Sequence, residues 1–128
     1  MATDITISVD DRPGGLASVG EALGAAGINI EGLLGIAMEG RGIVHVCVQD
    51  GGAARKALED AGIKVEGEAE AILGGAVPGA DQAGTMGVMA RAVADAGVNV
   101  RAVYVATGSR VAMVTDDNAK VMELMASM

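Results

Sequence analysis

Two short stretches of this sequence place glycine and an acidic residue directly before an apolar segment with helical spacing. They are Asp11-Arg12-Pro13-Gly14-Gly15-Leu16 and the stretch from Asp81 to Met86. Small residues leave the backbone N–H groups of a helix start open to a ligand, and the helix dipole favours an anion there. A carboxylate fits that position, and the acidic residue of each loop would accept hydrogen bonds from an ammonium group. Donors for a carboxylate beside acceptors for an amine predict a site for an α-amino acid.

Two asparagines follow the expected helices, where an apolar residue or threonine would be the commoner choice. The amides of Asn29 and Asn99 donate and accept hydrogen bonds at once, as a ligand contact requires. The alternative is that each asparagine only caps the turn at Gly27 or Gly97. Because the glycine loop, the acidic residue and the asparagine occur together twice, ligand binding is the favoured interpretation.

The segments that must position these loops alternate between strand and helix patterns. Apolar residues at every second position predict strands, and an apolar stripe with a spacing of three or four residues predicts helices that end at Gly27 and Gly62. The expected elements are a strand over 5–9, a helix over 16–27, a hairpin of 28–38 and 43–48, a helix over 53–61 capped by Asp50, and a strand over 63–68. Their order is β-α-β-β-α-β.

An internal repeat predicts the organisation of the second half. Asp11 recurs as Asp81 and Asn29 as Asn99, a constant spacing of 70 residues that falls to 66 beyond the hairpin. The second half is expected to contain a strand over 70–77, a helix over 84–96, strands over 98–106 and 110–115, and a helix from 117. No sequence remains for a fourth strand, which leaves one sheet edge open. We therefore predict two modules, 1–69 and 70–128, packed rigidly without a linker.

This element order predicts an α+β, ferredoxin-like fold for each module, with an antiparallel sheet and both helices on one face. The opposite face should be solvated, yet several apolar residues are expected there. They are Ile43 and Cys47 in the first module and Val111 and Met113 in the second. A partner module or another subunit would cover them, so we expect a homodimer or a larger assembly.

The composition excludes several classes of partner. The 128 residues carry a formal net charge of −8, which repels nucleic acid and anionic lipid surfaces. No run approaches the roughly 20 apolar residues of a membrane span, and the N-terminus lacks the basic start of a signal peptide. The single Cys47 lies in an apolar alternating run, as expected of a small buried residue in a reducing compartment. We expect a soluble cytoplasmic protein.

The sequence offers little for catalysis. His45 is the only histidine, so neither a histidine metal cluster nor a two-histidine relay is available. Glu66, Glu68 and Glu70 alternate along one strand face, as on a solvated edge. We therefore expect no enzymatic activity, no cofactor and no metal.

The first half of the sequence resembles the ACT domain. The pattern of that family is a strand, a polar residue before Pro-Gly, an apolar helix and a Gly-Ile-Asn-Ile segment that enters the second strand. Here the matching segments are the loop from Asp11 to Leu16, the helix that follows it, and Ala26-Gly27-Ile28-Asn29-Ile30. The resemblance extends to the repeat over 81–100, where Ala83 replaces the proline and Thr85 the second glycine. It implies an allosteric regulatory protein that binds an amino acid at the interface between tandem modules and controls an amino-acid biosynthetic enzyme.

Carried over position by position, the resemblance implies two sets of ligand-binding residues. They are Asp11, Arg12, Gly14, Gly15, Leu16, Asn29 and Ile30 in the first module and Asp81, Gly84, Thr85, Met86, Asn99 and Val100 in the second. The replaced proline and glycine predict a weakened or altered second site. Two alternatives remain open: a regulatory small subunit similar to that of acetolactate synthase, and an oligomerisation module with empty loops.

Overall fold

The computed structural model describes residues 1–74 and 82–127. Its elements follow the order expected from the sequence. They are β1 (Ala2–Asp10), α1 (Gly15–Ala25), β2 (Gly32–Met38), β3 (Arg41–Val48), α2 (Gly51–Asp60), β4 (Lys64–Gly74), α3 (Thr85–Asp95), β5 (Val100–Ala106), a short 3-10 turn η1 (Thr107–Ser109), β6 (Arg110–Thr115) and α4 (Asn118–Ala126). None of these helices is both long and apolar enough to cross a bilayer.

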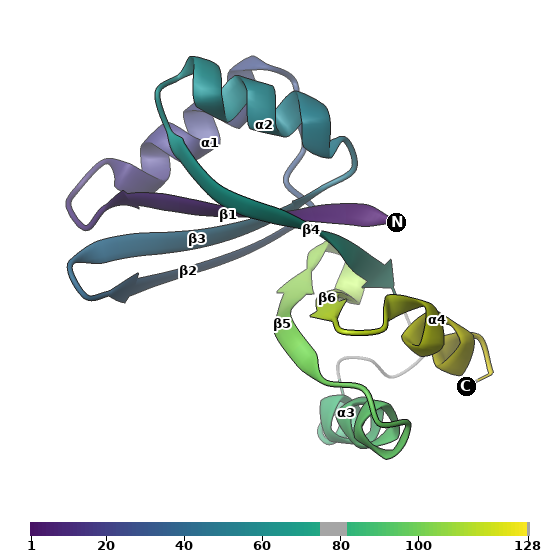
Figure 1. Ribbon diagram of the computed structural model, residues 1–128. Helices are drawn as coiled ribbons and strands as arrows, with labels where there is room; N and C mark the ends of the chain where they lie inside the picture. The colour runs from purple at the N-terminus through teal and green to yellow at the C-terminus, as the bar shows by residue number, and fades with distance from the viewer. Residues whose placement is uncertain (75–81, 128) are drawn as a thin grey trace.

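The first half forms a four-stranded antiparallel sheet in the order β4-β1-β3-β2, with α1 and α2 together on one face (Figure 1). Alternate residues of β1 and β3 face these helices. The fully buried part of this core consists of Ile5, Ile7, Val19, Leu23, Val44, Val46, Val48, Ala54 and Leu58. Asp50 caps α2 as expected, because its carboxylate accepts a hydrogen bond of 3.0 Å from the Ala53 N–H group. The α+β, ferredoxin-like arrangement is confirmed for this half.

One continuous strand connects the two halves. The first part of β4 pairs with β1, as in Ile5↔Glu68, whereas its last three residues, Ile72–Gly74, pair with β6. Gly67 does not end the strand but lies beside a bulge, where the register shifts between Thr6 and Ile7. The two strands expected over 63–68 and 70–77 are therefore one strand as far as Gly74, and residues 75–77 lie outside the described part.

The second half contains β4, β6 and β5 in that order, with α3 and α4 near them (Figure 1). The antiparallel sheets predicted for the two modules, either one extended sheet or two adjoining ones, are instead joined into one closed ring of six strands in the order β1-β3-β2-β5-β6-β4. The closure between β2 and β5 consists of a single residue pair, Gly32↔Ala106. A Cβ atom at Gly32 would lie 2.9 Å from Cε2 of Tyr104, so the closure requires glycine there. Within the described residues no strand follows α4.

The spacing of 66 residues predicted between β3 and β6 is wrong by one residue, so it assigns the residues of β6 to the wrong faces of the sheet. Val111 and Met113 were expected on the face away from the helices, but Met113 packs with Val93 of α3 and Val121 of α4. The helix caps agree with a spacing of 67 residues, because Asp50 caps α2 and Asp117, rather than Asp116, caps α4. A shift of one residue moves every side chain of a strand to its opposite face, which explains the error.

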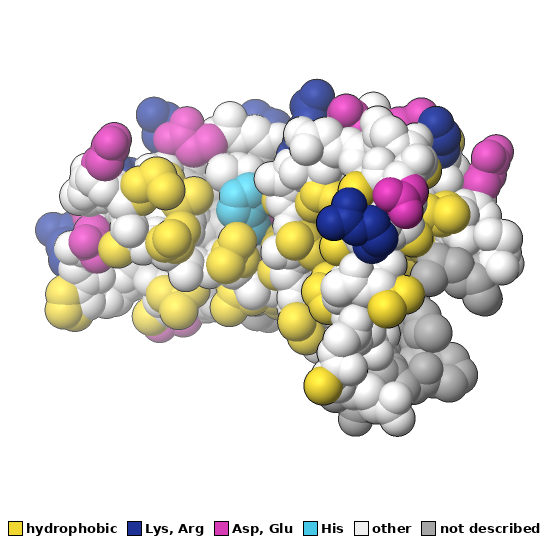
Figure 2. All heavy atoms as spheres, turned by 90° about the horizontal axis from the view of Figure 1, so that it is seen from below, with side chains coloured by type: hydrophobic (Ala, Val, Ile, Leu, Met, Phe, Trp, Pro, Cys, Tyr) yellow, Lys and Arg dark blue, Asp and Glu magenta, His cyan; other side chains and the backbone are white. Residues whose placement is uncertain are grey.

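The second half covers part of the sheet face opposite α1 and α2. Cys47 is fully buried there, with Tyr104 and Ala112 among its neighbours. The rest of this face remains exposed in the single chain, and Figure 2 shows hydrophobic side chains on both sides of the histidine. Leu34, Ile36 and Met38 are exposed by 37%, 52% and 54%.

Candidate ligand site at the start of the first helix

A tight loop connects β1 to α1. The Arg12 N–H group donates to the carbonyl oxygen of Asp10 at 2.9 Å, and the Gly15 N–H group donates to that of Arg12 at 3.2 Å. Gly14, the residue before the helix, has φ of +96°, a conformation that glycine adopts without strain. A Cβ atom on Gly15 would lie 2.9 Å from the carbonyl oxygen of Asp10. Both glycines are therefore required by the backbone itself, whatever they contribute to binding.

A hollow of about 250 Å³ lies between this loop and the β2–β3 hairpin. The loop contributes Asp11, Arg12 and Leu16, three of the residues expected to bind the ligand. The complete lining is Val9, Asp10, Asp11, Arg12, Leu16, Gly35, Ile36, Ala37, Gly42, Ile43 and Val44. The volume is below the roughly 300–1,000 Å³ of pockets for drug-sized ligands, which favours a smaller molecule.

Charged groups surround the hollow. Asp10 pairs with Arg41 of β3 and, at 3.3 Å, with Arg12. The Arg41 Nε–H group also donates to the Ser8 hydroxyl oxygen at 3.0 Å, so Arg41 lies on the face of β1 that Ser8 shares, and it does not line the hollow. The first-turn N–H groups of α1 have no acceptor within the helix, as at every helix start. The loop therefore offers a carboxylate the Arg12 guanidinium and the first-turn N–H groups other than that of Gly15, which already donates to Arg12. Arg41 was missed from the sequence, because only the β1–β3 register brings it to Asp10.

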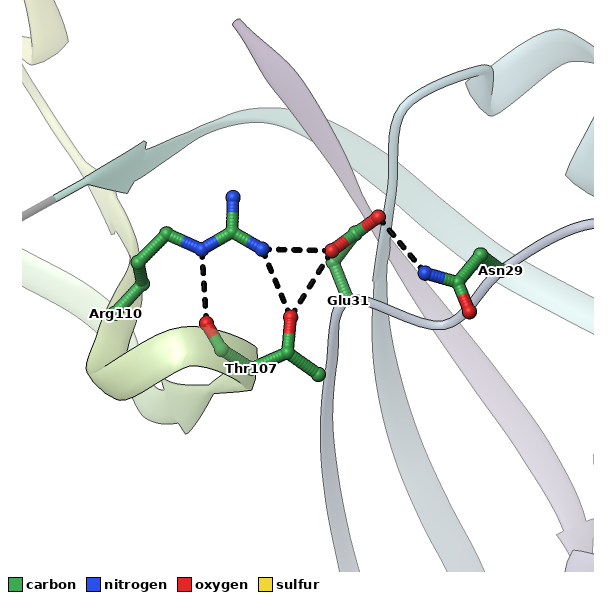
Figure 3. A network of polar contacts seen from close by, with 4 residues as sticks. All are labelled: Asn29, Glu31, Thr107 and Arg110. Carbon is green, nitrogen blue, oxygen red and sulfur yellow. Dashed lines mark hydrogen bonds and ion pairs between the residues drawn. The ribbon is translucent and has the colours of Figure 1, made fainter. Parts of the chain in front are cut away.

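Asn29 and Ile30 do not reach this hollow within one chain. They follow α1, whose 11 residues separate them from the loop by about 16 Å. Ile30 packs against the first core, and Asn29 is exposed. The Asn29 Nδ2 group donates to Oε1 of Glu31 at 3.0 Å (Figure 3). The structure thus separates the two parts of the predicted first site.

Glu31 is the centre of a polar network that the sequence analysis also missed. Thr107 Oγ1 and Arg110 Nη2 donate to its Oε2 atom at 3.0 Å and 2.7 Å (Figure 3). The hydrogen bonds from Asn29, Thr107 and Arg110 lower the pKa of Glu31, although partial burial acts in the opposite direction. This carboxylate therefore remains charged at neutral pH and connects the two halves of the chain.

The second loop has the same backbone geometry as the first. Gly84 precedes α3 with φ of +92°, and the Thr85 N–H group donates to the carbonyl oxygen of Gln82 at 3.3 Å. Met86 is 41% exposed, as Leu16 is exposed at its own loop. Asp81 lies outside the described residues. No residue of this loop lines the hollow at the first helix.

Asn99 and Val100 are held by contacts inside the second half. The Asn99 N–H group donates to Oδ1 of Asp116 at 3.0 Å, and the Asn99 carbonyl oxygen accepts from the Asp116 N–H group at 3.1 Å. Val100 packs against the cluster around Val93. In the single chain these two residues therefore have a structural role.

A buried cluster joins β1, β3 and β5. Asp4, only 3% exposed, accepts hydrogen bonds from the Tyr104 hydroxyl at 2.5 Å and pairs with Nδ1 of His45 at 2.9 Å. Burial, followed by the hydrogen bond to Asp4, raises the pKa of Tyr104, and burial raises that of Cys47 to about 11. Within the described residues, no three metal-binding side chains gather at one place. This cluster holds the halves together and leaves Cys47 in its unreactive thiol form at neutral pH.

Comparisons with known proteins agree with the fold. The ACT domain model matches residues 3–63. A structure of a protein from Bacteroides thetaiotaomicron is similar to this chain with a TM-score of 0.73 and 24% identity, over 98% of this chain and 87% of the other. The ligand-free regulatory subunit of aspartate kinase from Thermus thermophilus is similar with a TM-score of 0.69 and 22% identity, over 99% and 91%.

Aspartokinase alpha and beta subunits give a TM-score of 0.70 at 15% identity, over 98% of this chain and 90% of the matched chain. No curated protein sequence matches this chain. At these identities the structural likeness establishes the fold alone. The match of the ACT domain model over residues 3–63 agrees with the strand order β4-β1-β3-β2 of this half.

Proposed function

We propose that this chain is a non-catalytic regulatory protein that binds a small amino acid at the loop from Asp11 to Leu16. The observation that carries the proposal is the hollow of about 250 Å³, which this loop lines beside the open start of α1. An ACT domain over residues 3–63 and the fold shared with aspartate kinase regulatory subunits support a sensing role. The ligand carboxylate would bind near Arg12 and the first-turn N–H groups, where the helix dipole adds partial positive charge.

A second copy of the chain would complete the site. Beyond Gly32, the outer edge of β2 has no strand partner among the described residues, and its exposed side chains are apolar. A two-fold axis through this edge would pair two copies of β2 antiparallel, so that the start of one strand lies beside the end of the other. Asn29 of one copy would then approach the hollow of its partner. This arrangement reunites the two parts of the predicted first site in a homodimer.

We further propose that residues 70–128 form a second ACT module. The support is the order β4-β6-β5, which matches β1-β3-β2 in the first half, and the matching loop geometry at Gly14 and Gly84. Because Ala83 and Thr85 replace the proline and the second glycine of the first loop, we expect the second loop to bind ligand weakly or only to stabilise the fold. The arrangement would be a tandem repeat with one strong site.

A regulatory subunit acts by linkage, because a ligand that prefers one arrangement of the modules shifts the population towards it. The partner we propose is an amino-acid biosynthetic enzyme in the cytoplasm. The catalytic subunit of aspartate kinase is the first candidate, since the regulatory subunit from Thermus thermophilus has a similar fold over nearly its whole length.

Thermal unfolding with each of the twenty common L-amino acids tests the proposal. A ligand at 100 times its dissociation constant adds about 2.7 kcal/mol to the stability of the folded state, which raises the melting temperature clearly. At least one amino acid should do so. If none does, the chain is an oligomerisation module with empty loops and the proposal fails.

Two matched pairs of variants locate the site. Gly15→Val should abolish the ligand-induced shift, measured against its own unliganded melting temperature, whereas Gly20→Val, in open space on α1, should retain it. Asn29→Ala should reduce the shift more than Asn99→Ala. Equal losses at both asparagines would contradict the proposed inequality of the two sites. Sedimentation should give a dimer, and Ile36→Lys on the exposed face should shift it towards the monomer.

A further inference from the structure

The Asn29 side-chain amide has a fixed orientation. A carboxylate has only acceptor atoms, so Glu31 selects the Nδ2 end of the amide as its partner. The carbonyl oxygen of Asn29 then points away from Glu31, as Figure 3 shows, and Asn29 is an exposed residue. An outward carbonyl accepts a hydrogen bond from an ammonium group, whereas an outward NH2 group would repel one.

Glu31 is itself held in place by the other half of the chain. The Arg110 Nε–H group donates to the Thr107 carbonyl oxygen and its Nη2 atom to Thr107 Oγ1, both at 2.8 Å, while Nη2 also binds Glu31. The carboxylate of Glu31 is only 15% exposed and the guanidinium of Arg110 31%. This is a partly desolvated pair with additional hydrogen bonds, the geometry in which removal of one charged partner has a measurable cost.

The network around Glu31 lies beside the contact between β2 and β5, where a single residue pair closes the ring of strands. Next to the single β2–β5 pair, the Thr107 N–H group donates to the Glu31 carbonyl oxygen at 2.8 Å. Backbone and side chain of Glu31 therefore both depend on η1 and the start of β6. A change in how the two halves pack would release Glu31 and, with it, the Asn29 amide.

We propose that Glu31 is a positioning residue, which aims the Asn29 carbonyl oxygen outward to accept a hydrogen bond from the ammonium group of the ligand. Arg110 and Thr107 make this orientation dependent on the packing of the second half against the first. The inference rests on the proposed function, because it takes Asn29 as a ligand contact. It adds a route by which ligand affinity and the arrangement of the halves are coupled through named atoms.

The test measures the dissociation constant of whichever of the twenty L-amino acids stabilises the wild type, in the full-length Glu31→Gln variant. The glutamine side chain is the same size, but its NH2 group can donate to the Asn29 oxygen and allow the amide to turn. Affinity should fall about tenfold, the usual scale for one hydrogen bond. Arg110→Lys should weaken binding in the same direction. Glu59→Gln, the same change at an exposed ion pair on α2, is the control and should bind normally.

A double-mutant cycle separates positioning from a general loss of stability. In an Asn29→Ala background, Glu31→Gln should have no further effect on affinity, because no amide remains to be oriented. An equal tenfold loss in both backgrounds overturns the inference. The side-chain NH2 signals of Asn29 in nitrogen-15 NMR spectra give a readout without ligand, and they should move in Glu31→Gln but not in Glu59→Gln. If no amino acid binds the wild type, the proposed function and the inference fail together. If one binds and Glu31→Gln binds it equally well, only the inference fails.

Discussion

Replacing Gly15 and Gly20 by alanine should change stability in opposite directions, although both glycines lie in α1. At Gly15 the new Cβ atom would lie 2.9 Å from the carbonyl oxygen of Asp10 and 3.1 Å from Cγ2 of Val9. The Asp10 carbonyl is part of the backbone and already accepts a hydrogen bond from Arg12, so it cannot move without opening the loop. Overpacking of this kind costs about 1–3 kcal/mol.

At Gly20 the Cβ atom would meet nothing within 4 Å. The variant gains only the helix propensity of alanine over glycine, about 1 kcal/mol. Urea unfolding followed by circular dichroism should therefore separate Gly15→Ala from Gly20→Ala by about 2–4 kcal/mol in the free energy of unfolding. Equal stability of the two variants would refute the close contact between the loop and the end of β1, and with it the shape of the proposed site.

Three further predictions concern the core, the cysteine and the loss of stability at acidic pH. Met113→Ala should lower the free energy of unfolding, measured with urea, by about 2–5 kcal/mol, because Met113 is buried beneath the helices. Val105→Ala should lower it by less than about 0.5 kcal/mol, because Val105 is 72% exposed. Iodoacetamide should not label Cys47 at pH 8 until urea unfolds the chain, because its thiol is buried with a pKa of about 11; rapid labelling of the native protein would contradict this. The pKa of Glu31 is lower in the folded than in the unfolded chain, so its contribution to stability is complete above about pH 4.3 and is lost as the pH falls through the folded pKa. Urea unfolding from pH 7 to pH 3 should thus show a smaller acid-induced loss in Glu31→Gln than in the wild type.

Local signals were sufficient for most of the fold. Asp50 before an apolar stripe predicted the start of α2, and positive φ at Gly14 and Gly27 agrees with the predicted helix boundaries. These features depend on neighbouring residues and on backbone geometry that only glycine adopts easily. The absence of a linker between the two halves was also predicted, and β4 continues from one half into the other as far as Gly74.

The register of β6 could not be predicted in the same way. Val111 to Val114 is an unbroken apolar run, so alternation does not indicate which residues face the helices. The choice depends on contacts with both sides of the sheet, since Ala112 and Val114 pack against Cys47 while Met113 packs against Val121. Only the assembled structure distinguishes the two faces.

The charged partners at the candidate site depend on tertiary structure for the same reason. Arg41 reaches Asp10 through pairing of β1 with β3, and Arg110 reaches Glu31 across 79 positions of the sequence. Nothing in the local pattern around these residues identifies a partner. The sequence identified the loop that lines the hollow, whereas the structure identified the partners of Asp10 and Glu31.

Mapping the bound amino acid on the folded chain tests directly whether the loop from Asp11 to Leu16 is the ligand site. Nitrogen-15 NMR spectra of the full chain would be recorded while adding the L-amino acid that gives the largest thermal shift. Backbone signals of Asp11, Arg12 and Gly14 to Leu16 should move, together with those of Asn29 across the proposed dimer interface. Saturable changes confined to the second half, or no changes at all, would contradict it.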